Sequence, residues 1–223
     1  NYKSGDEYLS CARGKTNQSA IFLDSTGRTY ALLAHSLPSS RGQGEPLTGR
    51  VKPPAGATFE AVLMSEDTQH YLFATTAGYG FVTTFKQLLT KNKSGKAVLK
   101  IPLLARPLLP MPVTDLALDQ IVMISNIGRM LVFPLSALPL LSKGKGNKMI
   151  NIPTKDFKAE KEWVVAMGVL APNQSLEINS GKRTLTLRPK DLAYYKGDRG
   201  RRGNKLPRGF QRVDSLFASG DKR

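Results

Sequence analysis

The sequence is poor in the residues that build disulfide scaffolds, metal sites and histidine-based active sites. Its 223 residues include one cysteine and two histidines. Because Cys11 stands alone, the chain cannot form an internal disulfide, which favours a reducing compartment. His35 and His70 have no cysteine or aspartate at metal-ligand spacing, so neither a zinc site nor histidine-based catalysis is indicated.

Other signals are missing too. No apolar run approaches the roughly 18 residues that a membrane-spanning helix needs, and the first residues show no apolar signal core. Neither a phosphate-binding loop nor a dinucleotide motif occurs. The carboxylates are scattered and form no recurring pair for acid–base work. We therefore expect a cytoplasmic protein with no catalytic residue, no metal site and no cofactor of its own, and no membrane partner.

Positive charge is what the sequence has in excess. Lysine and arginine number 33 against 17 acidic residues, which gives a formal net charge of +16. A hydrophobic content of 40% is sufficient for a folded core. A basic folded chain favours a polyanionic partner, with nucleic acid before an anionic membrane or an acidic protein.

A glycine turn crowded with basic residues recurs along the chain. It occupies residues 39–44, 91–96, 142–148 and 200–205. The last glycines of these turns are Gly44, Gly95, Gly146 and Gly203, so the steps are 51, 51 and 57 residues. A nearly fixed period of this length indicates a repeat architecture.

Three further features keep the same register. Each unit opens with a glutamine, continues through a short strand-like run to a hairpin glycine, and then reaches a leucine that we expect in the core. The glutamines are Gln18, Gln69, Gln120 and Gln174; the glycines are Gly27, Gly78, Gly128 and Gly181; the leucines are Leu37, Leu88, Leu138 and Leu192.

Two more strands follow the basic turn in the units where they are clearest. The expected ranges are 47–51 and 58–64 in the first unit, and 149–152 and 163–166 in the third. Four short strands in about 51 residues predict an all-β fold with propeller-like, four-stranded blades. A parallel sheet of β–α units is the alternative, but no unit has a helical period long enough for a crossover helix, and prolines occur at 134, 139, 172 and 189.

We divide the chain into repeats 18–68, 69–119, 120–173 and 174–223 within one domain, 1–223. Residues 3–8 align with residues 54–59 at the same step of 51, so we interpret 1–17 as the tail of a truncated earlier repeat. Trp163 and the tyrosines could stack bases, but they do not recur with the basic turns, and we expect them to pack in the core or between blades.

Basic turns at equivalent positions suggest phosphate binding, in which glycines bring backbone N–H groups near phosphates and the flanking side chains neutralise them. Without a base-reading element, such a surface would bind and bend duplex DNA largely independently of sequence. The candidate DNA-binding residues are Arg28, Arg41, Lys91, Lys93, Lys96, Arg129, Lys143, Lys145, Lys148, Lys182, Arg183, Arg199, Arg201, Arg202, Lys205 and Arg208.

Five segments of the sequence resemble the C-terminal domain of ParC, the A subunit of bacterial topoisomerase IV. They are 24–28, 40–49, 141–148, 182–189 and 199–203, and the resemblance extends over essentially the whole chain. The related gyrase A protein carries a Q-R-R-G-G-K-G box that supports full DNA wrapping. Here Arg41-Gly42-Gln43-Gly44 and Gly200-Arg201-Arg202-Gly203 are only degenerate relatives of that box. This departure favours topoisomerase IV over gyrase.

The resemblance implies a β-pinwheel, a propeller-like disc whose blades exchange strands and whose basic edge binds and bends DNA. It also implies a nucleoid-associated, non-catalytic domain that guides the transported duplex and sets preference among supercoiled and catenated substrates for ATP-dependent relaxation, decatenation and chromosome segregation. ATP and Mg would act through other domains. The implied partners are the ATPase subunit of the holoenzyme and the N-terminal cleavage domain of ParC itself.

Two alternatives stay open. One is a propeller-type protein-interaction module whose basic rim recognises an acidic partner. The other is a propeller enzyme with a site in a central channel, which the lack of a histidine and carboxylate constellation disfavours.

Overall fold

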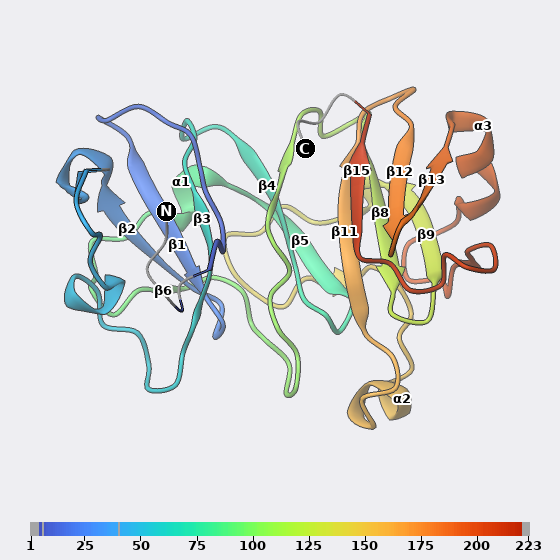
Figure 1. Ribbon diagram of the computed structural model, residues 1–223, viewed down its shortest axis with the longest axis horizontal. Helices are drawn as coiled ribbons and strands as arrows, with labels where there is room; N and C mark the ends of the chain where they lie inside the picture. The colour runs from blue at the N-terminus through green and yellow to red at the C-terminus, as the bar shows by residue number, and fades with distance from the viewer. Residues whose placement is uncertain (1–4, 6, 40, 220–223) are drawn as a thin grey trace. The chain divides into compact units, whose positions relative to one another are not determined.

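A computed structural model describes residue 5 and residues 7–39 and 41–219. The fold is mostly β, with four antiparallel sheets and only short helices (Figure 1). Contacts between Cα atoms divide the chain into two compact units. The first contains 1–69, 84–100 and 142–144, as far as these are described, and the second contains 70–83, 101–141 and the described part of 145–223.

The first unit contains one four-stranded sheet. Its order is β3 (Phe59–Leu63), β1 (Ser19–Asp24), β2 (Arg28–Leu33) and β6 (Lys96–Ala97). The hairpin of β1 and β2 turns at Gly27, which has a φ of +82°. A side chain rarely adopts that angle, so the glycine predicted for this turn is required there.

The second unit contains the other three sheets. One has the order β10 (Asn147–Lys148), β5 (Tyr79–Thr84), β4 (His70–Ala74), β7 (Met111–Val113). The next has the order β11 (Val164–Leu170), β8 (Gln120–Ser125), β9 (Arg129–Pro134), β14 (Asn204–Lys205). The last has three strands, β13 (Arg183–Leu187), β12 (Leu176–Ser180) and β15 (Ser215–Ala218).

Each four-stranded sheet takes its outermost short strand from the repeat that follows. Strands β6, β10 and β14 come directly after the last glycine of a basic turn and pair with β2, β5 and β9 of the preceding unit. The strand exchange implied by the resemblance is therefore present. All three pairings are antiparallel.

The helical segments are single turns that connect strands. The α-helical turns are α1 (Phe85–Leu88), α2 (Thr154–Lys158) and α3 (Pro189–Leu192), and the 3-10 turns are η1 (Ala34–Ser36), η2 (Leu47–Gly49), η3 (Leu135–Ala137) and η4 (Ala193–Tyr195). Leu88, Leu138 and Leu192 are buried as predicted, whereas Leu37 is only half-buried.

Both faces of β8 are covered, which explains its unbroken apolar sequence. Ile121 and Met123 belong to one buried cluster of the second unit, and Val122 and Ile124 belong to the other. Alternate residues of a strand point to opposite faces, so β8 lies between the two clusters.

Three strand predictions need correction. Residues 47–51 form no strand; Leu47–Gly49 is the 3-10 turn η2, in which the Gly49 N–H donates to the Pro46 carbonyl. Residues 149–152 form no strand; the strand is β10, two residues earlier. The apolar side chains after it are buried without a ladder partner, so hydrophobicity alone misplaced the strand. The last sheet has three strands within the described residues, not four.

Candidate nucleic-acid interface

The three exchanged strands dock in one register, which makes their basic turns structurally equivalent. Ala97 pairs with Arg28, Lys148 pairs with Tyr79, and Lys205 pairs with Arg129. Three residues after each last glycine, a buried apolar residue donates its N–H to the hairpin glycine of the preceding unit. These bonds run from Val98 to Gly27 (3.0 Å), from Met149 to Gly78 (2.7 Å) and from Leu206 to Gly128 (2.8 Å).

The last glycine of each turn is required by this docking. Gly95, Gly146 and Gly203 have φ angles of +73°, +76° and +73°. A Cβ on Gly146 would lie 2.0 Å from the Gly80 carbonyl oxygen, and one on Gly203 would lie 2.5 Å from that of Met130. Only glycine allows such a close approach of two backbones.

The turn glycines do not present their N–H groups as the sequence suggested. The N–H groups of Gly95, Gly144 and Gly200 donate to the carbonyls of Asn92, Val98 and Met149, respectively. The expectation that these glycines offer backbone donors to phosphates is therefore wrong for these three residues. Their backbone bonds hold the turns in place.

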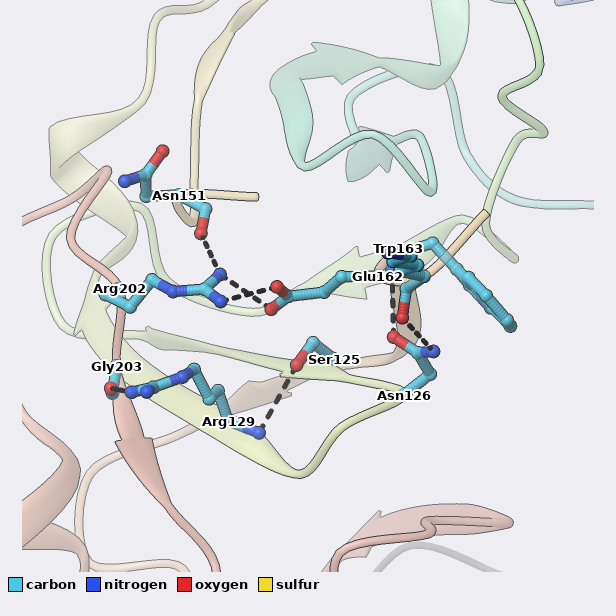
Figure 2. A network of polar contacts seen from close by, with 9 residues as sticks. Ser125, Asn126, Arg129, Asn151, Glu162, Trp163, Arg202 and Gly203 are labelled. Atoms are coloured by element: carbon cyan, nitrogen blue, oxygen red, sulfur yellow. Dashed lines mark hydrogen bonds and ion pairs between the residues drawn. The ribbon is translucent and has the colours of Figure 1, made fainter. Parts of the chain in front are cut away.

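Two hairpin arginines clamp the turns from the neighbouring strand. The Arg28 guanidinium donates to the carbonyls of Ser94 (3.1 Å) and Gly95 (3.3 Å). The Arg129 guanidinium donates to the carbonyl of Gly203 at 3.1 Å (Figure 2). Charged hydrogen bonds of this kind are stronger than neutral ones, so both arginines stabilise the fold in addition to contributing charge.

An aromatic ring takes the arginine's place in the remaining sheet. Tyr79 occupies the position of Arg28 and Arg129, and the Lys145 ammonium lies 3.6 Å from its ring centroid. The Lys148 ammonium, at 6.0 Å from the same ring, also donates to the Asn151 side chain at 3.3 Å. A cation over an aromatic face is attracted by the ring quadrupole. The Lys145 ammonium is therefore held at the Tyr79 ring.

Arg202 makes the most buried ion pair of the basic turns. Its guanidinium donates two hydrogen bonds to the Glu162 carboxylate, at 2.7 and 2.5 Å, and one to the Asn151 carbonyl at 2.9 Å (Figure 2). The Glu162 side chain is only 2% exposed. Arg199 donates to the Lys148 carbonyl at 2.6 Å. These two arginines join the last basic turn to β10 and the segment that follows it.

The first hairpin is held by a buried carboxylate. Asp24 accepts hydrogen bonds from the N–H groups of Thr26 and Arg28 and from the Tyr30 hydroxyl, the last at 2.7 Å. Burial, and then the bond to Asp24, raise the pKa of Tyr30 well above its ordinary value. Tyr30 therefore stays protonated and keeps Asp24 paired, which fixes the strand that carries Arg28.

The candidate residues therefore fall into two groups. Those engaged by the fold are Arg28, Lys96, Arg129, Lys145, Lys148, Arg199 and Arg202, where the Lys96 ammonium donates to the Gln87 carbonyl. Those with exposed side chains are Arg41, Lys91, Lys93, Lys143, Lys182, Arg183, Arg201, Lys205 and Arg208. Arg201 lies 3.8 Å from Asp198, a surface pair that contributes little.

Two residues of this region were not assigned from the sequence as the structure has them. The sequence indicated no role for Glu162, which pairs with Arg202. The residue before the last glycine of the turn is Ser94 or Lys145 in two repeats and Arg202 in another. An arginine at this position could have indicated a carboxylate partner. Trp163 was expected to pack in the core or between blades, but 37% of it is exposed. The placement in the core is wrong.

Neither a metal centre nor a membrane span is found in the part of the chain that the structure describes. In residues 7–39 and 41–219, no three histidine, cysteine, aspartate or glutamate side chains come together as metal ligands would. No helix in these ranges has the length and apolarity to cross a membrane.

Comparison with known proteins gives consistent matches. The family model described as DNA gyrase C-terminal domain, beta-propeller, matches residues 69–102 and 119–170. The A subunit of DNA topoisomerase 4 from Pseudomonas aeruginosa is 52% identical over 216 residues, covering 97% of this chain and 29% of the relative. Its counterpart from Escherichia coli K12 is 47% identical over 223 residues, covering 100% and 29%.

Solved structures show the same relationship. The E. coli ParC C-terminal domain is 47% identical with a TM-score of 0.89, covering 98% of this chain and 88% of that one. The DNA gyrase A C-terminal domain shares the fold at 15% identity, with a TM-score of 0.69 and coverage of 99% and 72%.

The four antiparallel sheets thus have the fold of the C-terminal domains of ParC and gyrase A. Within that class, the chain belongs to the family of C-terminal domains of ParC, the topoisomerase IV A subunit. It spans 29% of the length of the curated relatives named above.

Proposed function

We propose that this chain is a non-catalytic module that binds and bends duplex DNA through the nine exposed candidate lysines and arginines named above. In the larger protein it would guide the transported duplex and set preference among supercoiled and catenated substrates. The reaction itself, with ATP and Mg, would take place in the N-terminal cleavage domain of the same subunit and in the separate ATPase subunit. The single propeller-like disc stays a prediction within this proposal.

One observation carries the proposal most directly. The turns before β6, β10 and β14 are fixed in one register and offer exposed cations beside it, including Lys93, Lys143 and Arg201. The arginines that hold the turns, such as Arg28 and Arg129, are different residues from these exposed cations. The exposed ammonium and guanidinium groups are therefore available to a ligand. Cations that recur at equivalent positions of successive repeats suit a polyanion such as duplex DNA.

The proposed contact reads the DNA backbone. Phosphate contacts position a protein on DNA without carrying sequence information. Bending 20–30 base pairs costs about 1–6 kcal/mol, which several phosphate contacts together must offset. Repeated turns can supply such contacts, and this accounts for the strong positive charge of the chain.

A charge-matched pair of triple variants tests the proposal. In the first variant, Lys91, Lys93 and Lys143 are changed to alanine; all three are exposed cations of basic turns. Affinity for a duplex of about 30 base pairs should fall for every sequence. The slope of log K against log salt should become shallower by about 0.9 for each phosphate that is no longer neutralised. Fluorescence anisotropy at several salt concentrations measures both.

The matched control changes Lys155, Lys158 and Lys161, which are exposed on and after α2 and belong to none of the basic turns. It removes the same charge, so a general electrostatic effect would weaken both variants equally. A basic-turn variant that keeps the wild-type affinity and slope would overturn the proposal. Equal losses in the two variants would show that net charge, and not the turns, determines binding.

A further inference from the structure

Trp163 lines two adjoining grooves in the second unit. One, of about 460 Å³, is lined by residues that include Thr76, Arg106, Phe157 and Glu160. The other, of about 580 Å³, is lined by Asn126, Ile127, Trp163, Val165, Lys205, Gln211, Arg212 and Val213. We call this second one the Trp163 groove.

The backbone under the indole is held on both sides. The Trp163 N–H donates to the Asn126 side-chain oxygen at 2.9 Å (Figure 2). The Trp163 carbonyl accepts from the Asn126 backbone N–H, also at 2.9 Å. The Asn126 side-chain amide also donates to the Lys161 carbonyl at 3.1 Å. The ring itself points away from the Arg202–Glu162 ion pair (Figure 2). Trp163 therefore presents its indole from a fixed position.

The opposite wall of the groove is also fixed. A Cβ on Gly128 would lie 2.5 Å from the Gln211 Cα, so the segment with Gln211 and Arg212 packs directly on the β8–β9 hairpin. Lys205 is anchored by its strand pairing with Arg129. Both walls are thus part of the folded sheet and its docked turn.

The charges of the two grooves differ. The first balances Arg106 against Glu160, whereas the Trp163 groove has two cations, Lys205 and Arg212, and no acidic residue among the described residues that line it. Glu162, the adjacent carboxylate, is committed to Arg202. The Trp163 groove therefore suits an anion that also has an apolar face.

We propose that the Trp163 groove binds an unpaired nucleotide, with its base against the indole and its phosphate at Lys205 and Arg212. The bases of intact duplex DNA are stacked within the helix, so this is a second binding mode, distinct from the proposed duplex contact. In the described residues the Trp163 ring contacts no other aromatic ring. Trp163 is 37% exposed, so part of its indole is open to a flat base, and stacking of this kind tolerates any sequence.

The position of Lys205 favours a nucleic acid over an acidic peptide. Lys205 belongs to β14, directly after the last basic turn, so the groove is continuous with the exposed cations proposed to bind DNA backbone. A strand leaving that surface could place one unpaired base on the indole. A peptide would make no use of this continuity.

Intrinsic fluorescence tests the proposal directly, because Trp163 is the single tryptophan of the chain. Titration with the single strand hexathymidylate should quench the emission and saturate. Thymidine 5′-monophosphate tests the isolated nucleotide: equal affinity identifies a free nucleotide as ligand, and much weaker binding identifies a strand. No quenching by either overturns the proposal, and so does equal quenching by hexaglutamate.

Variants measured by anisotropy of labelled hexathymidylate separate stacking from charge. Trp163→Ala should weaken binding by about 5- to 100-fold, whereas Trp163→Phe should keep most of it. Arg212→Ala should reduce the salt slope by about 0.7 and leave duplex affinity unchanged, because Arg212 is outside the proposed duplex contact. Tyr194→Ala removes an exposed ring outside the groove and should change nothing.

The outcomes distinguish this proposal from the duplex proposal. Hexathymidylate binding with the expected variant effects, but without duplex binding, would overturn only the proposed function. Duplex binding with unchanged Trp163 emission in hexathymidylate would overturn only the groove. Wild-type hexathymidylate affinity in both Trp163→Ala and Arg212→Ala would also overturn it, and Arg212→Ala keeps the test valid if Trp163→Ala fails to fold.

Discussion

Single basic residues of this domain do two different kinds of work. The guanidinium groups of Arg28 and Arg129 donate hydrogen bonds to carbonyls of the neighbouring turn. Lys143, in contrast, is exposed in its turn. A substitution of either arginine would change both fold and charge. Binding experiments on this family are therefore best interpreted from exposed lysines, whose removal leaves the docking contacts intact.

The Tyr30 hydroxyl gives a pH-dependent prediction. Its pKa is raised in the folded state above about 10, the value of an unperturbed tyrosine. Above that pH the unfolded chain loses the proton while the folded chain keeps it. Stability present below pH 10 should then fall by about 1.4 kcal/mol per pH unit.

Tyr30→Phe removes the pH-dependent contribution of the Tyr30 hydroxyl to stability, together with its hydrogen bond to Asp24. It should cost about 1–3 kcal/mol at neutral pH, because a buried carboxylate oxygen loses its donor. The difference from wild type should shrink as the pH rises past about 10. Urea unfolding at neutral pH and above about pH 10 measures this difference in stability. Tyr194→Phe, which changes an exposed tyrosine, is the control. A difference that stays constant with pH would contradict the assignment.

At the scale of elements, the exchanged strands depend on a glycine that lies against a neighbouring backbone. Gly146 and Gly44 have nearly equal φ angles, +76° and +72°, but only Gly146 has atoms within 4 Å of an added Cβ. Alanine in the left-handed region costs about 1–2 kcal/mol at either position. Gly146→Ala should lose about 1–3 kcal/mol more, through the contact with Gly80.

Chemical denaturation of the two alanine variants measures this difference. Because the backbone strain is nearly the same in both, subtraction isolates the cost of displacing β10 from β5. Equal losses in the two variants would mean that the turn, and not its docking, requires glycine.

The sequence predicted the local elements well and the docking poorly. Hairpins could be predicted because a glycine such as Gly78 forces its own turn, and Gln18 and Gln174 each accept a nearby N–H that closes the turn before a strand. The strand at 147–148 was misplaced because its partner lies in another repeat, and the apolar residues beyond it imitate a strand. Local pattern cannot reveal a partner 70 residues away, roughly the separation of Lys148 from Tyr79.

The same limit applies to the candidate site. The cations were visible in the sequence, but which of them the fold engages depends on carbonyls and carboxylates of other repeats, as with Arg202 and Glu162. Trp163 was misjudged for a related reason. Its apolar side chain suggested burial, yet the Asn126 contacts hold its backbone at the edge of the sheet.

At the scale of the whole molecule, a formal charge of +16 should destabilise the fold through self-repulsion. Raising salt from about 10 to about 100 mM shortens the Debye length from about 30 to about 10 Å. The melting temperature, followed by circular dichroism, should therefore rise. The Lys155, Lys158 and Lys161 triple variant, with less charge, should show a smaller rise. A fall with salt would mean that ion pairs, not repulsion, dominate.

The strand exchange also determines how the domain forms during synthesis. The ladder edge of β2, ending at Leu33, stays open until Lys96 and Ala97 have emerged from the ribosome. At about 5–20 residues per second, the wait is roughly 3 to 13 seconds. During that time the nascent chain carries an unpaired edge, the feature that invites wrong pairing. Each of the first three repeats thus depends on a strand that is translated only with the next repeat.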